Sequence, residues 1–270
     1  MTTNNTHRKL GNVELNIIAR LTYEKTRIIT IRKLREMFAL TSKRSWKIAS
    51  QLIRKKILSP IKRGIYIFSP LEFGQAGRSI DEFLIASVFF QKGNYYIGYS
   101  TLYNYYGFSE QLFQTVYVLN TSRYFEKAIN GVLYKFIKVK QNRIYGIKKI
   151  KIDNTYVNIS SKERTLIDLI YFNKPIGGIT KAIEIFKQSV KSKDCNIKKL
   201  IDYAAQFPII KVRKLIGFIF DELQIKDSLL KPLIKSVQDT SLISLTSSRA
   251  GVINKKWNVI INDSQKQRQI

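Results

Sequence analysis

Basic and amide side chains recur along one side of residues 42–55, in a pattern suited to contacts with nucleic acid. On a helical wheel, at about 100° per residue, the polar and apolar residues of this segment fall in opposite arcs. The polar arc contains Lys43, Arg44, Lys47, Ser50, Gln51, Arg54 and Lys55. Lysine and arginine bond guanine edges and glutamine bonds adenine, so this arc has the chemistry to contact bases in the major groove of DNA.

The elements around this segment determine whether the arc can reach a duplex. Its apolar arc should pack on two preceding helices and contains Trp46, Ile48, Ala49, Leu52 and Ile53. Those helices are predicted from helical spacing of apolar residues at 13–21 and 31–40, and Thr41 or Ser42 should cap the third helix. Residues 57–68 alternate around Arg63-Gly64, which predicts a tight hairpin.

The predicted order of helix, helix, recognition helix and hairpin is that of a winged helix-turn-helix. Lys62 and Arg63 at the hairpin tip could contact phosphates or enter the minor groove. The other interpretation is a solvated basic surface, because many cationic amphipathic helices have no ligand. Residues 42–68 hold eight Lys or Arg and no acid, which favours the nucleic-acid interpretation.

The whole chain is strongly basic, with 47 Lys and Arg against 19 Asp and Glu over 270 residues and a net charge of +28. Skewed codon usage would explain many lysines, but it explains the scarcity of acids less well. A charge of this size repels itself, so a polyanionic partner is predicted. DNA or RNA comes first and an anionic membrane surface second.

Cysteine and histidine are too few for several kinds of chemistry. The single Cys195 excludes an internal disulfide and a cysteine-rich metal site, which fits a reducing cytoplasm. The single His7 excludes a multi-histidine metal site and a catalytic triad in the body of the chain. The polar N-terminus resembles no signal peptide, and no apolar run approaches the ~20 residues that span a bilayer. We therefore expect a cytoplasmic protein that does not span a membrane.

The density of basic residues and a segment interrupted by glycine and proline divide the chain into two predicted domains. Residues 1–70 hold 16 Lys and Arg against 3 acids, a much higher density than the rest of the chain. Glycine and proline interrupt the chain at residues 69–79, where we place the boundary. The fold class is therefore predicted as α+β. A winged helix-turn-helix (1–70) precedes a larger domain (79–270) that mixes strands and helices to about 175 and is mostly helical after.

A second basic cluster lies among the predicted strands of the larger domain. It contains Lys135, Lys138, Lys140, Arg143, Lys148, Lys149 and Lys151. Two interpretations stay open: a sheet surface that faces RNA or DNA, and an edge strand protected by lysines against aggregation. The tyrosine-rich segment at 94–108 could stack on bases, but its spacing favours a role in the core.

Signals for catalysis are weak. A metal-dependent nuclease needs converging carboxylates, and the candidates are Asp81-Glu82, Asp168 and Asp221-Glu222. Helix capping and salt bridges explain the first two, and the third lies in a helical stretch. The chain has no glycine-rich phosphate loop. The sequence therefore predicts a protein that is not an enzyme, with no catalytic residues, metal or cofactor.

Several short motifs follow one another along the chain in a characteristic order. RGIYIF ends the hairpin, and YYIGYSTLYNYYGF, TVYVLNTSR, VNISSKERTLIDLI and KKWNVIIND follow. In this order the chain resembles the AbiEi family, the antitoxins of type IV toxin–antitoxin and abortive-infection systems. The likeness covers the chain from about Val13, and SSKERTLIDLI is its most specific segment. The family often has His before Gly where this chain has Tyr106-Gly107, a change that a packing role would tolerate.

The resemblance implies a repressor of its own operon that acts in phage defence. Its N-terminal domain would bind inverted repeats in double-stranded DNA. Its C-terminal domain would counteract a nucleotidyltransferase-like toxin, without direct contact between the two proteins being implied. The competing hypotheses are an RNA-binding regulatory protein that uses the basic sheet of the larger domain, and a nuclease.

Overall fold

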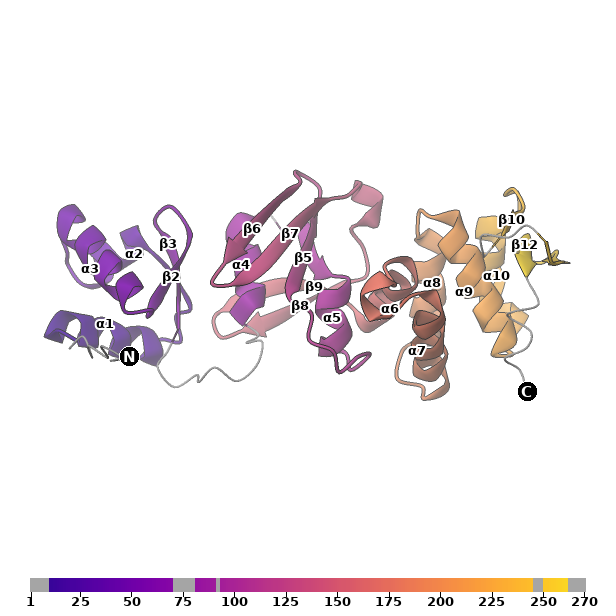
Figure 1. Cartoon of the computed structure of the whole chain (residues 1–270), viewed down its shortest axis with the longest axis horizontal. Helices are drawn as coiled ribbons and strands as arrows, with labels where there is room; N and C mark the ends of the chain where they lie inside the picture. The colour runs from indigo at the N-terminus through magenta and orange to yellow at the C-terminus, as the bar shows by residue number, and fades with distance from the viewer. Residues whose placement is uncertain (1–9, 70–80, 91–92, 245–249, 262–270) are drawn as a thin grey trace, which may run out of the picture.

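The chain has an α+β fold, with ten α-helices and three β-sheets among the residues that the structure describes. The structure is a computed structural model and describes residues 10–69, 81–90, 93–244 and 250–261. Figure 1 shows a small N-terminal part, a central sheet and a helical part following one another along the long axis. The predicted α+β class is confirmed. The predicted domain boundary at 69–79 lies almost entirely outside the described residues.

The N-terminal part packs three helices with an antiparallel sheet of order β1-β3-β2. Its elements are α1 (Asn12–Tyr23), β1 (Ile28–Thr30), α2 (Ile31–Met37), α3 (Ser42–Arg54), β2 (Leu58–Lys62) and β3 (Ile65–Phe68). Their apolar sides share one core, in which Ile17, Leu21, Leu34 and Leu52 are fully buried. Burying each such side chain contributes about 1.5–3 kcal/mol, so this core can hold the three helices in place.

Local side-chain chemistry sets the start of α3 and the turn that follows it. Thr41 Oγ1 accepts a hydrogen bond from the Arg44 N–H at 3.3 Å, which makes Thr41 the cap rather than Ser42. Gly64 has φ +71°, a conformation that glycine adopts without strain, and it closes the β2–β3 hairpin. Helix α3 therefore begins after a predicted cap residue, and the hairpin turns at the predicted glycine.

The buried side of α3 differs from the prediction at one position. The buried stripe consists of Ser45, Ile48, Ala49 and Leu52. Trp46 was expected to pack inside, but it is 40% exposed, at the edge of this stripe and beside Gly64 of the hairpin turn. Ser45 fills the buried position because its hydroxyl donates to a carbonyl of the preceding turn at 2.7 Å.

The central part is a mixed six-stranded sheet of order β6-β7-β5-β4-β9-β8. The strands are β4 (Tyr95–Gly98), β5 (Thr115–Asn120), β6 (Phe125–Ile129), β7 (Val132–Lys138), β8 (Ile147–Ile152) and β9 (Thr155–Ser160). Helices α4 (Asp81–Phe89) and α5 (Ser100–Tyr105) accompany the sheet, and the 3-10 helix η1 (Gln141–Arg143) joins β7 to β8. The sequence pattern does not predict β6, because this edge strand carries the charged residues Glu126 and Lys127 and buries only Ile129.

The tyrosine-rich segment forms β4 and α5 and belongs to the core. Tyr96 and Tyr103 are fully buried, and Tyr99 is nearly so. A serine at the start of a predicted helix is expected to cap it. Ser100 is instead the first residue of α5, and Tyr99 precedes the helix with φ +55°. The Tyr106 hydroxyl donates to the carbonyl of a β9 residue at 2.7 Å, which is a packing contact.

The helical part contains five helices and a small sheet. They are α6 (Lys162–Tyr171), α7 (Ile179–Lys191), α8 (Ile197–Gln206), α9 (Ile210–Glu222) and α10 (Asp227–Val237), with the 3-10 helix η2 (Lys174–Ile176) and strands β10 (Ile243–Ser244), β11 (Val252–Asn254) and β12 (Val259–Ile261). Trp257 is fully buried against Gly217 of α9, where a Cβ would lie 2.3 Å from the indole ring. Only glycine fits there. Within the described ranges, no helix is both long enough and apolar enough to cross a membrane.

Ser160 and Glu163 have the sequence spacing of a capping box, but the start of α6 differs from this prediction. Ser161, not Ser160, caps the helix by accepting the Arg164 N–H at 3.3 Å. Ser160 is the buried last residue of β9. Glu163 accepts the Asn196 N–H at 3.1 Å instead of bonding the cap residue. The two serines are adjacent. Ser160 is the last residue of β9 and its side chain is buried there, which leaves Ser161 to cap the helix.

A buried ionic cluster lies where α6 meets the central sheet. Two hydrogen bonds of 3.2 and 3.3 Å join the Arg164 guanidinium to Asp168, and both side chains are fully buried. Arg164 also donates to the Tyr96 hydroxyl at 3.0 Å. Arg143 donates to the Tyr99 hydroxyl at 3.1 Å and lies 3.7 Å from Asp168. Two cations, Arg164 and Arg143, therefore share the Asp168 carboxylate. Burial acts to lower the pKa of Arg164, but the Asp168 charge outweighs it and the pKa lies above its ordinary value.

The N-terminal part contacts the central sheet through the hairpin and the end of α1. Polar contacts between described residues of the two parts include Lys62 Nζ to the Val88 carbonyl (2.9 Å), Lys127 Nζ to the Ile61 carbonyl (2.8 Å), Arg27 to Asp153 (2.7 Å) and Asn154 Nδ2 to the Glu24 carbonyl (2.8 Å). Ile61 and Ile67 also join the apolar core beneath α4. The hairpin is therefore part of the contact between the two parts of the chain.

Candidate nucleic-acid interface

The exposed side of α3 carries the polar residues that the sequence places there. Exposed on this side are Lys43, Arg44, Lys47, Ser50 and Arg54, while Gln51 and Lys55 are half-buried. Among the ion pairs between described residues, none involves the first three of these cations or Arg54. Their charges are not neutralised within this part of the chain, so they can bind phosphate or base edges.

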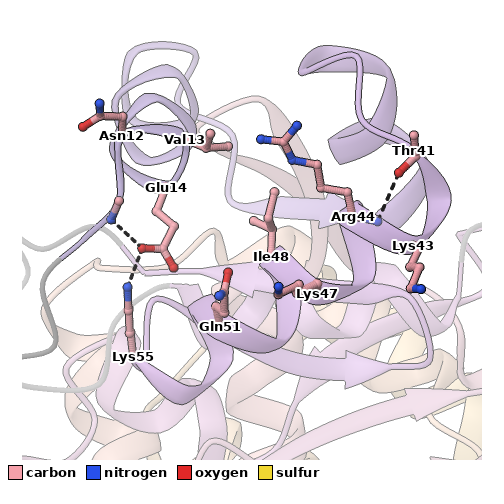
Figure 2. A pocket seen from close by; sticks show the side chains of 11 residues that line it. Asn12, Val13, Glu14, Thr41, Lys43, Arg44, Lys47, Ile48, Gln51 and Lys55 are labelled. Atoms are coloured by element: carbon pink, nitrogen blue, oxygen red, sulfur yellow. Dashed lines mark hydrogen bonds and ion pairs between the residues drawn. The ribbon is translucent and has the colours of Figure 1, made fainter.

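A groove with a volume of about 740 Å³ runs between the N-terminal end of α1 and this side of α3 (Figure 2). Its walls are Gly11, Asn12, Val13 and Glu14 on one side, and Thr41, Lys43, Arg44, Lys47, Ile48, Gln51 and Lys55 on the other. Five of the seven predicted polar residues of α3 therefore meet in one groove. Ser50 and Arg54 are exposed on the same helix but do not line it.

Glu14 lines the groove, although the polar pattern of the sequence gives it no role in binding. Its Oε2 accepts the Gly11 N–H at 2.8 Å and pairs with Lys55 Nζ, as Figure 2 shows. Burial acts to raise the pKa of Glu14, but the bonds from Lys55 and Gly11 outweigh it, and the pKa lies below its ordinary value. Lys55 was predicted to bind DNA, but its charge is neutralised by Glu14. The available sequence signal was a Gly-x-x-Glu pattern at the helix start.

The hairpin tip differs from the prediction in one of its two cations. Lys62 points to α4, where its ammonium donates to the Val88 carbonyl and lies 5.8 Å from the centre of the Phe89 ring. It therefore does not project as part of a free wing, because the hairpin packs against α4. Arg63 is exposed, as predicted.

The second basic cluster does not form one surface. Arg143 is buried in the ionic cluster with Asp168, so its predicted place on an exposed surface is wrong. Lys135 pairs with Glu126 at 3.2 Å, and Lys148 lies over the rings of two tyrosines of the α5 segment. The other members, all exposed, are Lys138, Lys140, Lys149 and Lys151. The last two lie on β8, at the edge of the sheet, as the edge-protection interpretation requires.

Two of the carboxylates considered for a nuclease, Asp168 and Asp221, have other partners in the structure. Asp168 is held by Arg164 inside the ionic cluster. Asp221 accepts Lys256 Nζ and Trp257 Nε1, each at 2.6 Å. Within the described residues, no group of three or more Asp, Glu, His or Cys side chains is arranged to hold a metal ion.

Comparison with known proteins shows that the fold of this chain is similar to that of a solved structure. No family model and no curated protein matches the chain. Among solved structures, the chain is similar to the crystal structure of the RV2827C protein from Mycobacterium tuberculosis, with a TM-score of 0.61 over 94% of this chain and 92% of that chain. The two sequences are 11% identical, so this similarity concerns the fold alone.

Proposed function

We propose that this protein is a DNA-binding transcriptional autorepressor whose residues 12–68 act as a winged helix-turn-helix. In this proposal α3 is the recognition helix, and the domain that follows residue 79 carries the antitoxin function. The single observation that supports DNA binding best is the exposed, acid-free side of α3, where Lys43, Arg44 and Lys47 border the groove to α1. An α-helix of this kind fits the major groove of a duplex.

The antitoxin part of the proposal rests on the resemblance to the AbiEi family. The protein would work in the cytoplasm within a type IV toxin–antitoxin system and counteract a nucleotidyltransferase-like toxin. By binding inverted repeats upstream of its own operon, the protein would repress its own transcription. The supply of antitoxin would then depend on the antitoxin concentration. RNA binding through the central sheet has less support, because the basic residues there are dispersed between a buried cluster, ion pairs and the sheet edge.

A gel-retardation experiment tests the DNA-binding part of the proposal. The full chain should retard the DNA upstream of its own gene more strongly than a random duplex of equal length, and the affinity should fall steeply with salt. Alanine at Arg44, Lys47, Gln51 and Arg54 should remove the preference for the upstream DNA while circular dichroism remains unchanged. Equal retardation of both duplexes by the wild type would refute the repressor function.

A genetic experiment tests the antitoxin part. A nucleotidyltransferase-like gene next to the coding sequence should inhibit growth when expressed alone, and co-expression of this chain should restore growth. Absence of such a gene, or inhibition that persists on co-expression, would leave a DNA-binding regulator without an antitoxin role.

A further inference from the structure

The groove between α1 and α3 has an uneven distribution of charge. Near the start of α3 it is lined by Lys43, Arg44 and Lys47, none of which takes part in an ion pair between described residues. Near the end of α3 it is lined by Lys55, whose ammonium pairs with Glu14 across the groove (Figure 2). One end therefore attracts phosphate, and the other end is neutral.

Glu14 is the one carboxylate among the described residues that line this groove. Only 6% of the residue is exposed, and while Oε2 binds Gly11 and Lys55, Oε1 has no hydrogen-bond partner within the described residues. A buried carboxylate oxygen without a partner is costly. Capping α1 does not require the charge, because the side-chain oxygen of a glutamine could accept the same Gly11 N–H. The negative charge therefore calls for a further explanation.

We infer that Glu14 is a specificity-determining residue for DNA, an inference that rests on the proposed function. It withholds Lys55 from phosphate and repels a DNA backbone from the α1 end of the groove. Phosphate contacts are thereby confined to the Lys43–Lys47 end. Non-specific binding consists almost entirely of phosphate contacts, whereas binding to an operator adds base contacts. A charge that limits phosphate contacts therefore weakens binding to random DNA more than binding to the operator.

The test compares full-length wild type with Glu14→Gln and with the double variant Glu14→Gln/Lys55→Met. Affinity for a random duplex and for the upstream DNA is measured between 50 and 200 mM salt. With Glu14→Gln, one additional phosphate contact should steepen the salt slope by about 0.9, which is an extra loss of about 3.5-fold over this range. The ratio of specific to non-specific affinity should fall. The double variant lacks both charges and should return to the wild-type slope.

Two controls keep the result interpretable. Glu14→Asp keeps the charge and should keep the wild-type slope, and circular dichroism establishes that each variant is folded. If Glu14→Gln does not fold, Lys55→Met is compared with the double variant, because these two proteins also differ only in the charge of Glu14. The variant that keeps Glu14 should then bind the random duplex more weakly.

Distinct outcomes overturn the inference and the proposed function. A wild-type salt slope in Glu14→Gln, or a steeper slope that persists in the double variant, overturns the role of Glu14. A wild type that binds random and upstream DNA equally well refutes the repressor function instead. The effect of Glu14 on the slope is still measured on the random duplex in that case.

Discussion

Replacement of Asp168 by asparagine should strongly destabilise the helical part of the chain. Asp168 is the shared partner of Arg164 and Arg143, and neither Asp168 nor Arg164 is exposed to solvent. The Asp168→Asn variant removes the only negative charge of this cluster and raises its buried net charge from +1 to +2. Removing one partner of a buried ion pair typically costs about 3–5 kcal/mol, because the other charge is left without compensation. This is a large share of the roughly 5–15 kcal/mol that stabilises a domain.

Urea unfolding followed by tryptophan fluorescence measures this effect directly. The chain has two tryptophans, and a Trp46→Phe background leaves the buried Trp257 as a reporter of the helical part. Asp239 is exposed, so Asp239→Asn is the matched control and should change the free energy of unfolding by no more than about 0.5 kcal/mol. Adding Arg164→Met to Asp168→Asn should recover part of the loss, because it removes one uncompensated charge. A loss below about 1 kcal/mol in Asp168→Asn would refute the reasoning.

Three further results are expected. Lys62→Ala should leave DNA affinity within about twofold of wild type in a gel-retardation titration, whereas Lys47→Ala should weaken it several-fold, because the Lys62 ammonium is held by the Val88 carbonyl of α4. Gly217→Ala should cost about 1–3 kcal/mol in urea and alter Trp257 fluorescence, because the methyl group would overlap the indole ring. Burial raises the pKa of Cys195 to about 11, so iodoacetamide at pH 8 should meet about 100-fold fewer thiolates than in the unfolded chain, and alkylation should accelerate as the pH rises towards 11.

The sequence predicts the elements of the N-terminal part well, because each element carries its own signal. Helical spacing of apolar residues marks α1 and α2, a threonine cap marks the start of α3, and Gly64 marks the hairpin turn. These signals are local: they depend on a side chain and its neighbours within a few residues. The same logic identified the tyrosine-rich segment as core, and burial of Tyr96 and Tyr103 confirms it.

The failures occurred where a distant segment decides what a side chain contacts. Lys55 is paired by a glutamate 41 positions earlier, and Lys62 is covered by α4 from the central sheet. Arg143 is buried because Tyr171 and Phe207, from the helical part, lie against its guanidinium at 4.7 and 4.9 Å. Periodicity shows which side of an element is polar, but it does not show which other element covers that side. These three cations therefore looked equivalent to those that α3 leaves exposed.

The ion pairs, taken together, show which side chains carry the excess positive charge of the chain. The acids of the described residues are mostly used in pairs, such as Glu14 with Lys55, Asp153 with Arg27 and Asp221 with Lys256. Each pair neutralises one cation. The excess positive charge of +28 therefore resides on cations that have no such partner. On α3, the four cations from Lys43 to Arg54 all belong to this second group, and no acid lies on the helix. A polyanion approaching the N-terminal part would therefore meet unneutralised cations on α3, beside the groove whose opposite wall carries Glu14.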